Sequence, residues 1–143
     1  MFNATYNQAA RAYAQVGVET GVAAANPHRL VEMLFDGVLA KLATAREAIL
    51  ARDPARRGEA VSRAIEIISG GLRASLDPKA GAIAEQLEDL YDYMTVRLLV
   101  GSTQNRTAEL DEVAGLLTQL RNAWTAIRPA PAAEVAPRVA AEV

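Results

Sequence analysis

The sequence predicts an all-α protein that folds as an antiparallel, up-down bundle of four helices. Four segments of about 20 residues repeat apolar residues at alternating spacings of three and four, which gathers those residues on one face of a helix. Short turn signals that contain proline or glycine separate the segments, so successive helices should run antiparallel. Sustained alternation of apolar and polar residues, the sign of a strand, is absent from the sequence.

The composition is that of a single folded domain with no marked affinity for nucleic acid or membranes. The chain has 143 residues, of which 51% are apolar, and this is enough to bury a core. Its 15 basic and 17 acidic residues are scattered and give a net charge of −2, which offers no basic field to nucleic acid. The sequence contains no cysteine, no signal peptide and no apolar run long enough to cross a bilayer. We therefore expect a cytoplasmic protein that neither inserts into a membrane nor binds nucleic acid.

Residues 1–25 are expected to form an arm rather than part of the bundle, because the segment is rich in small and polar residues and glycines interrupt it. The arm nevertheless carries several apolar side chains, which are Phe2, Tyr6, Tyr13, Val16 and Val18. Burying even one tyrosine against the bundle would stabilise the contact by roughly 1 to 3 kcal/mol. The arm is therefore expected to dock on the bundle.

The first helix is predicted to run from Pro27 to about residue 51. Asn26 is a favourable N-cap, and Pro27 suits the first helical position because the N–H that proline lacks would have no partner there. The apolar stripe of this helix consists of Val31, Phe35, Val38, Leu42, Ala45 and Ile49. Asp53 and Pro54 should end it, because the residue before a proline is disfavoured in helical geometry.

The second helix is predicted over residues 55–76, and the third from Pro78 to about residue 101. Gly70 and Gly71 should each destabilise the last turns of the second helix by about 1 kcal/mol relative to alanine. Asp77 is expected to cap the third helix. The expected core residues are Val61, Ile65, Ile68, Leu72 and Leu76 in the second helix, and Ile83, Leu87, Leu90, Met94 and Leu98 in the third. These two stripes should face the stripe of the first helix.

The fourth helix is predicted over residues 107–127. Its apolar stripe consists of Leu110, Val113, Leu117, Leu120, Trp124 and Ile127, and Trp124 is interpreted as a core residue. Residues 128–143 contain three prolines and many alanines, so this segment is expected to be a disordered tail. The predicted organisation is therefore an arm over residues 1–25, a bundle over residues 26–127 and a tail.

Catalytic motifs are missing from the sequence. The only histidine, His28, lies in the first turn of the first helix and is interpreted as a polar residue of that turn. The sequence has no Glu-x-x-His pair for a metal site in a bundle, and Gly70-Gly71 lacks the strand-to-helix setting of a phosphate loop. We expect no enzymatic activity, no metal and no cofactor.

Several apolar and aromatic residues are not explained by the predicted core. Met33, Ile67, Val96 and Leu99 point away from the stripes of their helices, and they are either ordinary surface residues or the lining of a groove for a partner helix or the arm. The segment Leu-Tyr-Asp-Tyr-Met at residues 90–94 places two tyrosines at the edge of the core. Their hydroxyl groups either contact water or hydrogen-bond to the backbone of a partner.

Several sequence blocks, in the same order, resemble the FliS family of flagellar secretion chaperones. The blocks are Ala-Tyr-Ala-Gln-Val (residues 12–16), Val-Glu-Thr (18–20), Asn-Pro-His-Arg-Leu-Val-Glu-Met-Leu-Phe-Asp-Gly (26–37), Ala-Ile-Glu-Ile-Ile (64–68), Leu-Tyr-Asp-Tyr-Met (90–94) and Leu-Arg-Asn-Ala-Trp (120–124). The sequence differs from the family pattern after Lys79, where Ala80 and Gly81 replace the frequent Gly-Gly, and again after Leu99. The resemblance spans about residues 12–127.

The resemblance implies a cytosolic chaperone that binds the disordered C-terminal segment of flagellin, prevents premature polymerisation and assists delivery to the flagellar type III export gate. It also implies that the N-terminal arm, in which Tyr13 matches the family's arm tyrosine, occupies part of the client groove. The candidate groove residues are Leu30, Met33, Ile67, Tyr91, Tyr93, Met94 and Arg97, and the candidate capping residues of the arm are Tyr13 and Val16. The alternative is a regulatory or structural bundle that binds a folded partner or itself, and the oligomeric state remains open.

Overall fold

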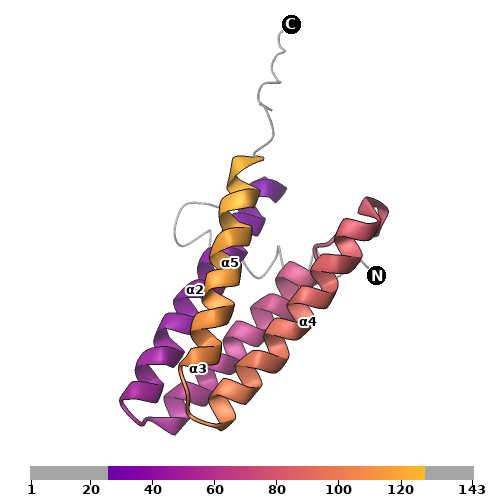
Figure 1. Cartoon of the computed structure of the whole chain (residues 1–143). Helices are drawn as coiled ribbons and strands as arrows, with labels where there is room; N and C mark the ends of the chain where they lie inside the picture. Colours follow the sequence, from indigo (N-terminus) through magenta and orange to yellow (C-terminus); the bar gives the residue numbers. More distant parts are fainter. Residues whose placement is uncertain (1–25, 128–143) are drawn as a thin grey trace, which may run out of the picture.

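The structure is a computed structural model that describes residues 26–127. Its four α-helices are α2 (Pro27–Leu50), α3 (Pro54–Ile67), α4 (Ala82–Thr103) and α5 (Ala108–Ala126), and two short segments, the π-helix η1 (Ile68–Arg73) and the 3-10 helix η2 (Pro78–Ala80), connect α3 to α4. The helices run alternately up and down along the bundle (Figure 1). The predicted all-α four-helix bundle is confirmed, and the expected arm and tail lie outside the described residues.

Local sequence signals set the first two helix starts as predicted. The side chain of Asn26 accepts a hydrogen bond from the amide of Arg29 at 2.8 Å and caps α2. The side chain of Asp53 accepts from the amide of Arg56 at 3.2 Å and caps α3. In both helices proline follows the cap, where no amide hydrogen is needed.

The predicted end of the second helix and the predicted start of the third helix were wrong. The second helix ends at Arg73 rather than near residue 76, and its last turns form the π-helix η1. Asp77 caps only the short helix η2, and Gly81, with a φ of 73°, separates η2 from α4. This left-handed backbone is readily adopted by glycine, so the chain turns at Gly81 and α4 begins one residue later.

The core runs along the bundle axis and contains most of the predicted stripe residues. The largest fully buried side chains are Ile68, Leu72, Met94, Leu98, Leu110, Leu117, Val38 and Val113. Val96 and Leu99 are exposed, as their position on α4 indicated. Ile83 was expected in the core but is 55% exposed, because α4 and α5 diverge towards the end of the bundle where α4 begins (Figure 1).

The π-helix η1 lies close against α2. A Cβ atom at Gly71 would lie 2.8 Å from Cδ2 of the buried Leu34, closer than a Cβ normally approaches another atom. Glycine at this position therefore allows the close approach, which leaves the neighbouring Leu72 buried in the core. None of the helices described for residues 26–127 is both long and apolar enough to span a membrane.

Candidate functional site

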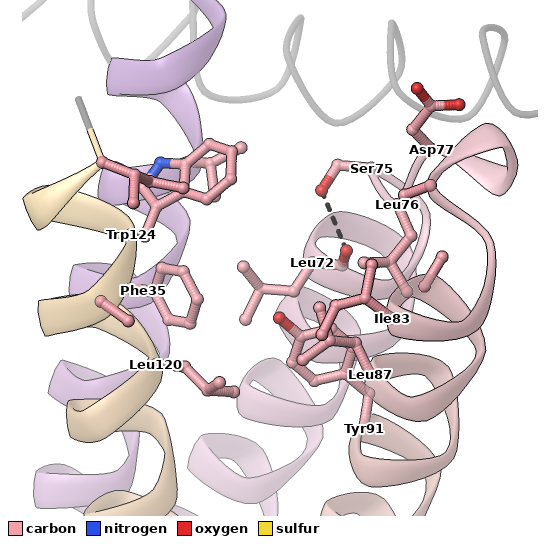
Figure 2. A pocket seen from close by; sticks show the side chains of 15 residues that line it. Phe35, Leu72, Ser75, Leu76, Asp77, Ile83, Leu87, Tyr91, Leu120 and Trp124 are labelled. Atoms are coloured by element: carbon pink, nitrogen blue, oxygen red, sulfur yellow. Dashed lines mark hydrogen bonds between the residues drawn. The ribbon is translucent and has the colours of Figure 1, made fainter. Parts of the chain in front are cut away.

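An apolar cavity of about 540 Å³ lies at the end of the bundle where α2 begins and α5 ends. Two walls enclose it, and they face each other in Figure 2. The first wall comes from α2 and α5 and consists of Val31, Phe35, Leu120, Ala123, Trp124 and Ile127. The second wall comes from η1, η2, the loop between them and α4, and consists of Leu72, Ser75, Leu76, Asp77, Ala80, Ile83, Ala84, Leu87 and Tyr91. The cavity therefore opens where α4 diverges from α5.

Polar contacts hold the first wall together. Nε of Arg121 on α5 lies 2.5 Å from Oδ1 of Asp36 on α2. The indole N–H of Trp124 donates to the carbonyl oxygen of His28 at 3.0 Å, and the two rings stack with their centroids 4.6 Å apart. His28 was expected to be an ordinary polar residue of the first turn, but this stacking buries it.

The second wall has its own polar contacts. Arg73, the last residue of η1, reaches across to α4, where its guanidinium lies 2.9 Å from Oδ1 of Asp92 and 3.1 Å from Oε2 of Glu88. The hydroxyl of Ser75 donates to the carbonyl oxygen of Leu72 at 2.9 Å. The ion pairs of Arg73 attach α4 to η1, and none of these contacts reaches the first wall.

A third polar group joins α4 to α5 further from the cavity mouth. Glu112 of α5 accepts a hydrogen bond from the hydroxyl of Tyr93 at 2.5 Å and another from Nε of Arg97 at 2.7 Å. The Arg97 guanidinium also lies 6.0 Å from the centre of the Tyr93 ring. We call these three residues the Glu112 cluster, and it holds α4 and α5 together beyond the point where they separate.

The Glu112 cluster should make the thermal stability of the protein depend on pH in the acidic range. Hydrogen bonds from Tyr93 and Arg97 lower the pKa of Glu112 below its ordinary value of 4.5. A carboxyl group whose pKa is lowered by folding contributes stability above its unfolded pKa, and the contribution disappears as the pH falls through the folded pKa. We therefore expect Glu112→Gln to melt at a lower temperature than the wild type at pH 7, and this difference to shrink below pH 4.5.

Thermal melting of both proteins between pH 7 and 3 measures this effect. Glu59→Gln is the matched control, because Glu59 is an exposed glutamate of α3. A difference between wild type and Glu112→Gln that stays constant across the pH range would contradict the proposed ionisation.

The lining of the cavity is largely apolar and is suited to binding apolar groups. Its polar lining residues are Ser75, Asp77 and Tyr91. Burial raises the pKa of Tyr91 to about 12, so its hydroxyl is neutral at physiological pH. Among residues 26–127 no group of three or more His, Cys, Asp or Glu side chains could hold a metal ion.

The structure brings one of the candidate groove residues to this cavity, namely Tyr91. Leu30, Met33 and Ile67 are partly buried and lie outside the lining, while Tyr93 and Arg97 belong to the Glu112 cluster. Met94 is fully buried, so it packs the core and offers no surface to a partner. The candidate arm residues Tyr13 and Val16 lie outside the described residues.

The other lining residues of the cavity were not predicted as site residues. Leu72, Leu87, Leu120 and Trp124 were assigned to the core because they follow the helical period. Periodicity identifies the face of a helix that points inward, but it does not reveal a gap between two helices. Trp124 is half-buried and lines the cavity instead of filling the core.

The described residues form a four-helix bundle with an open apolar cavity at one end, an arrangement typical of helical proteins that bind apolar groups. The family model for the flagellar protein FliS matches residues 9–131. The chain therefore belongs to the FliS family.

Similarity to individual proteins extends over most of the chain. The chain is 48% identical over 120 residues to the flagellar secretion chaperone FliS of Salmonella typhimurium, and the match covers 83% of this chain and 89% of that protein. The chain is 42% identical over 121 residues to the flagellar secretion chaperone FliSB of Pseudomonas aeruginosa, and the match covers 84% of this chain and 95% of that protein. The chain is 34% identical over 113 residues to the flagellar secretion chaperone FliS of Bacillus subtilis, and the match covers 79% of this chain and 80% of that protein.

Proposed function

We propose that this chain is a non-enzymatic chaperone of the cytosol that binds the disordered C-terminal segment of flagellin. Binding prevents premature polymerisation and assists delivery of flagellin to the flagellar type III export gate. The observation that carries the proposal is the open apolar cavity in a member of a family of secretion chaperones. No cofactor takes part in this function.

The physical basis is the removal of apolar surface from water. The assembly segment of a filament subunit must be apolar in order to pack in the filament, so free subunits associate wherever these segments meet. Each Å² of apolar surface that the chaperone covers is worth about 25 cal/mol. Apolar side chains of the segment therefore enter the cavity and are unavailable to other subunits until the segment is released.

A direct titration tests the proposal. The chain is titrated with a peptide that covers the C-terminal assembly segment of flagellin from the same organism, with affinity followed by calorimetry and helicity by circular dichroism. Binding with a gain of helix supports the chaperone function. A scrambled peptide of the same composition controls for nonspecific binding of apolar peptides. Absence of binding by the folded protein would contradict it, and self-association in size-exclusion chromatography would then favour the regulatory or structural bundle.

The arm of residues 1–25 is proposed to compete with the client. It joins α2 at Asn26, close to the first wall, and its sequence includes Tyr13 and Val16. An arm that occupies the cavity lowers the apparent affinity for client by the fraction of molecules that it blocks. Deletion of residues 1–16 should therefore raise the affinity for the flagellin peptide, as measured by calorimetry.

The deletion is compared with a full-length variant in which Tyr13 and Val16 are both replaced by serine. This variant keeps the length of the arm and should reproduce the gain in affinity. Unchanged affinity in both proteins would rule out competition by the arm.

A further inference from the structure

Tyr91 presents to the apolar cavity a hydroxyl group that has no hydrogen-bond partner within residues 26–127. The residue is only 4% exposed, and its ring packs in the core cluster. The hydroxyl end points into the space between the two walls (Figure 2). Among the hydrogen bonds of residues 26–127, none involves this hydroxyl. The hydroxyl oxygen is not one of the fully buried, unpaired side-chain atoms of residues 26–127, so it is accessible to a molecule that enters the cavity.

Each of the other polar side chains of the lining takes part in a hydrogen bond within residues 26–127. The Ser75 hydroxyl donates to a backbone carbonyl, and the Asp77 carboxylate accepts from the amide of Lys79. The Trp124 N–H donates to the carbonyl of His28. Among the lining residues, Tyr91 is therefore the polar side chain that makes no hydrogen bond within residues 26–127.

We propose that the Tyr91 hydroxyl is a specificity-determining anchor, which donates a hydrogen bond to a carbonyl oxygen of an otherwise apolar peptide segment bound in the cavity. The carbonyl belongs to the backbone or to a side-chain amide. That the segment comes from flagellin rests on the proposed function, whereas the hydrogen-bonding chemistry rests on the geometry of Tyr91.

The surroundings of the hydroxyl favour a neutral acceptor. Leu72, Leu87 and Phe35 are among the apolar residues that line the cavity with Tyr91, so a hydrogen bond made here is strengthened by the low local dielectric. Because the pKa of Tyr91 is about 12, the phenol keeps its proton and donates at physiological pH. A site that offers a buried donor discriminates against a ligand without an acceptor, since the donor would then remain unpaired.

Tyr91→Phe tests the anchor because it removes only the hydroxyl. The flagellin peptide should bind about 5- to 10-fold more weakly to this variant, as expected for one neutral hydrogen bond. The melting temperature of the free protein should stay the same or rise, because the hydroxyl has no hydrogen-bond partner within residues 26–127. This combination separates a ligand contact from a structural role, which would lower the melting temperature.

Tyr93→Phe is the matched control, two residues along α4. Its hydroxyl bonds to Glu112 and does not reach the cavity, so its loss should lower the melting temperature and leave peptide affinity unchanged. Wild-type peptide affinity in Tyr91→Phe would overturn the anchor, and so would a fall in its melting temperature that matches that of Tyr93→Phe.

A second probe tests the anchor if the wild type does not bind the flagellin peptide, an outcome that contradicts the proposed function alone. Cyclohexanone and methylenecyclohexane have nearly the same shape, but only the former carries a carbonyl acceptor. In NMR titrations the wild type should bind cyclohexanone more tightly, and Tyr91→Phe should lose this preference. Equal binding of both probes by the wild type would overturn the proposal.

Discussion

Leu98→Ala should lower the free energy of unfolding by about 2 to 5 kcal/mol, the usual cost of removing a fully buried leucine side chain. Leu98 lies on the inner face of α4 and has no exposed surface. Its replacement leaves a cavity between α4 and the helices that pack against it. Urea denaturation followed by circular dichroism measures the change.

Leu99→Ala is the control, because Leu99 follows Leu98 on the same helix and is 51% exposed. A surface substitution of this kind changes stability by about 0.5 kcal/mol or less. Similar losses in both variants would mean that the inner and outer faces of α4 are assigned incorrectly.

Ala123→Trp should reduce affinity for the flagellin peptide by about 100-fold or more, which corresponds to about 2.7 kcal/mol. Ala123 lies on α5 between two other lining residues, Leu120 and Trp124. Its side chain is small and exposed, so an indole at this position can enter the cavity without displacing core residues. Calorimetry with the wild-type peptide measures the loss.

Asn122→Trp is the matched control, since Asn122 is exposed and lies outside the cavity lining. It introduces the same side chain on the same turn of α5 and should leave peptide affinity close to that of the wild type. Equal losses in both variants would place the binding surface elsewhere on α5, and no loss in Ala123→Trp would exclude the cavity as the binding site.

Local signals were sufficient to predict the fold and most helix boundaries. Asn26 with Pro27, and Asp53 with Pro54, cap their helices through bonds to residues three positions away, and such short-range effects can be read from sequence. The end of the second helix could not be predicted in this way. The last turns of this helix form the π-helix η1, in which Gly71 lies close to Leu34 of another helix.

The candidate site was harder to predict because it is a property of the space between helices. Tyr91 was singled out from its position beside the core stripe, and the structure places it in the lining of the cavity. Tyr93 and Arg97 were singled out with it, but both contact Glu112, 19 and 15 positions further along the chain. Sequence periodicity places a residue on a helix face, whereas the partner of that face is set by tertiary packing.

The ion pairs that hold one wall of the cavity are separate from those that hold the other wall, and this affects how an apolar segment enters between them. Arg121 with Asp36 braces one side of the entrance, and Arg73 with Glu88 and Asp92 braces the other. Neither set of ion pairs joins one wall to the other, so the entry of an apolar segment between the walls requires neither set to break.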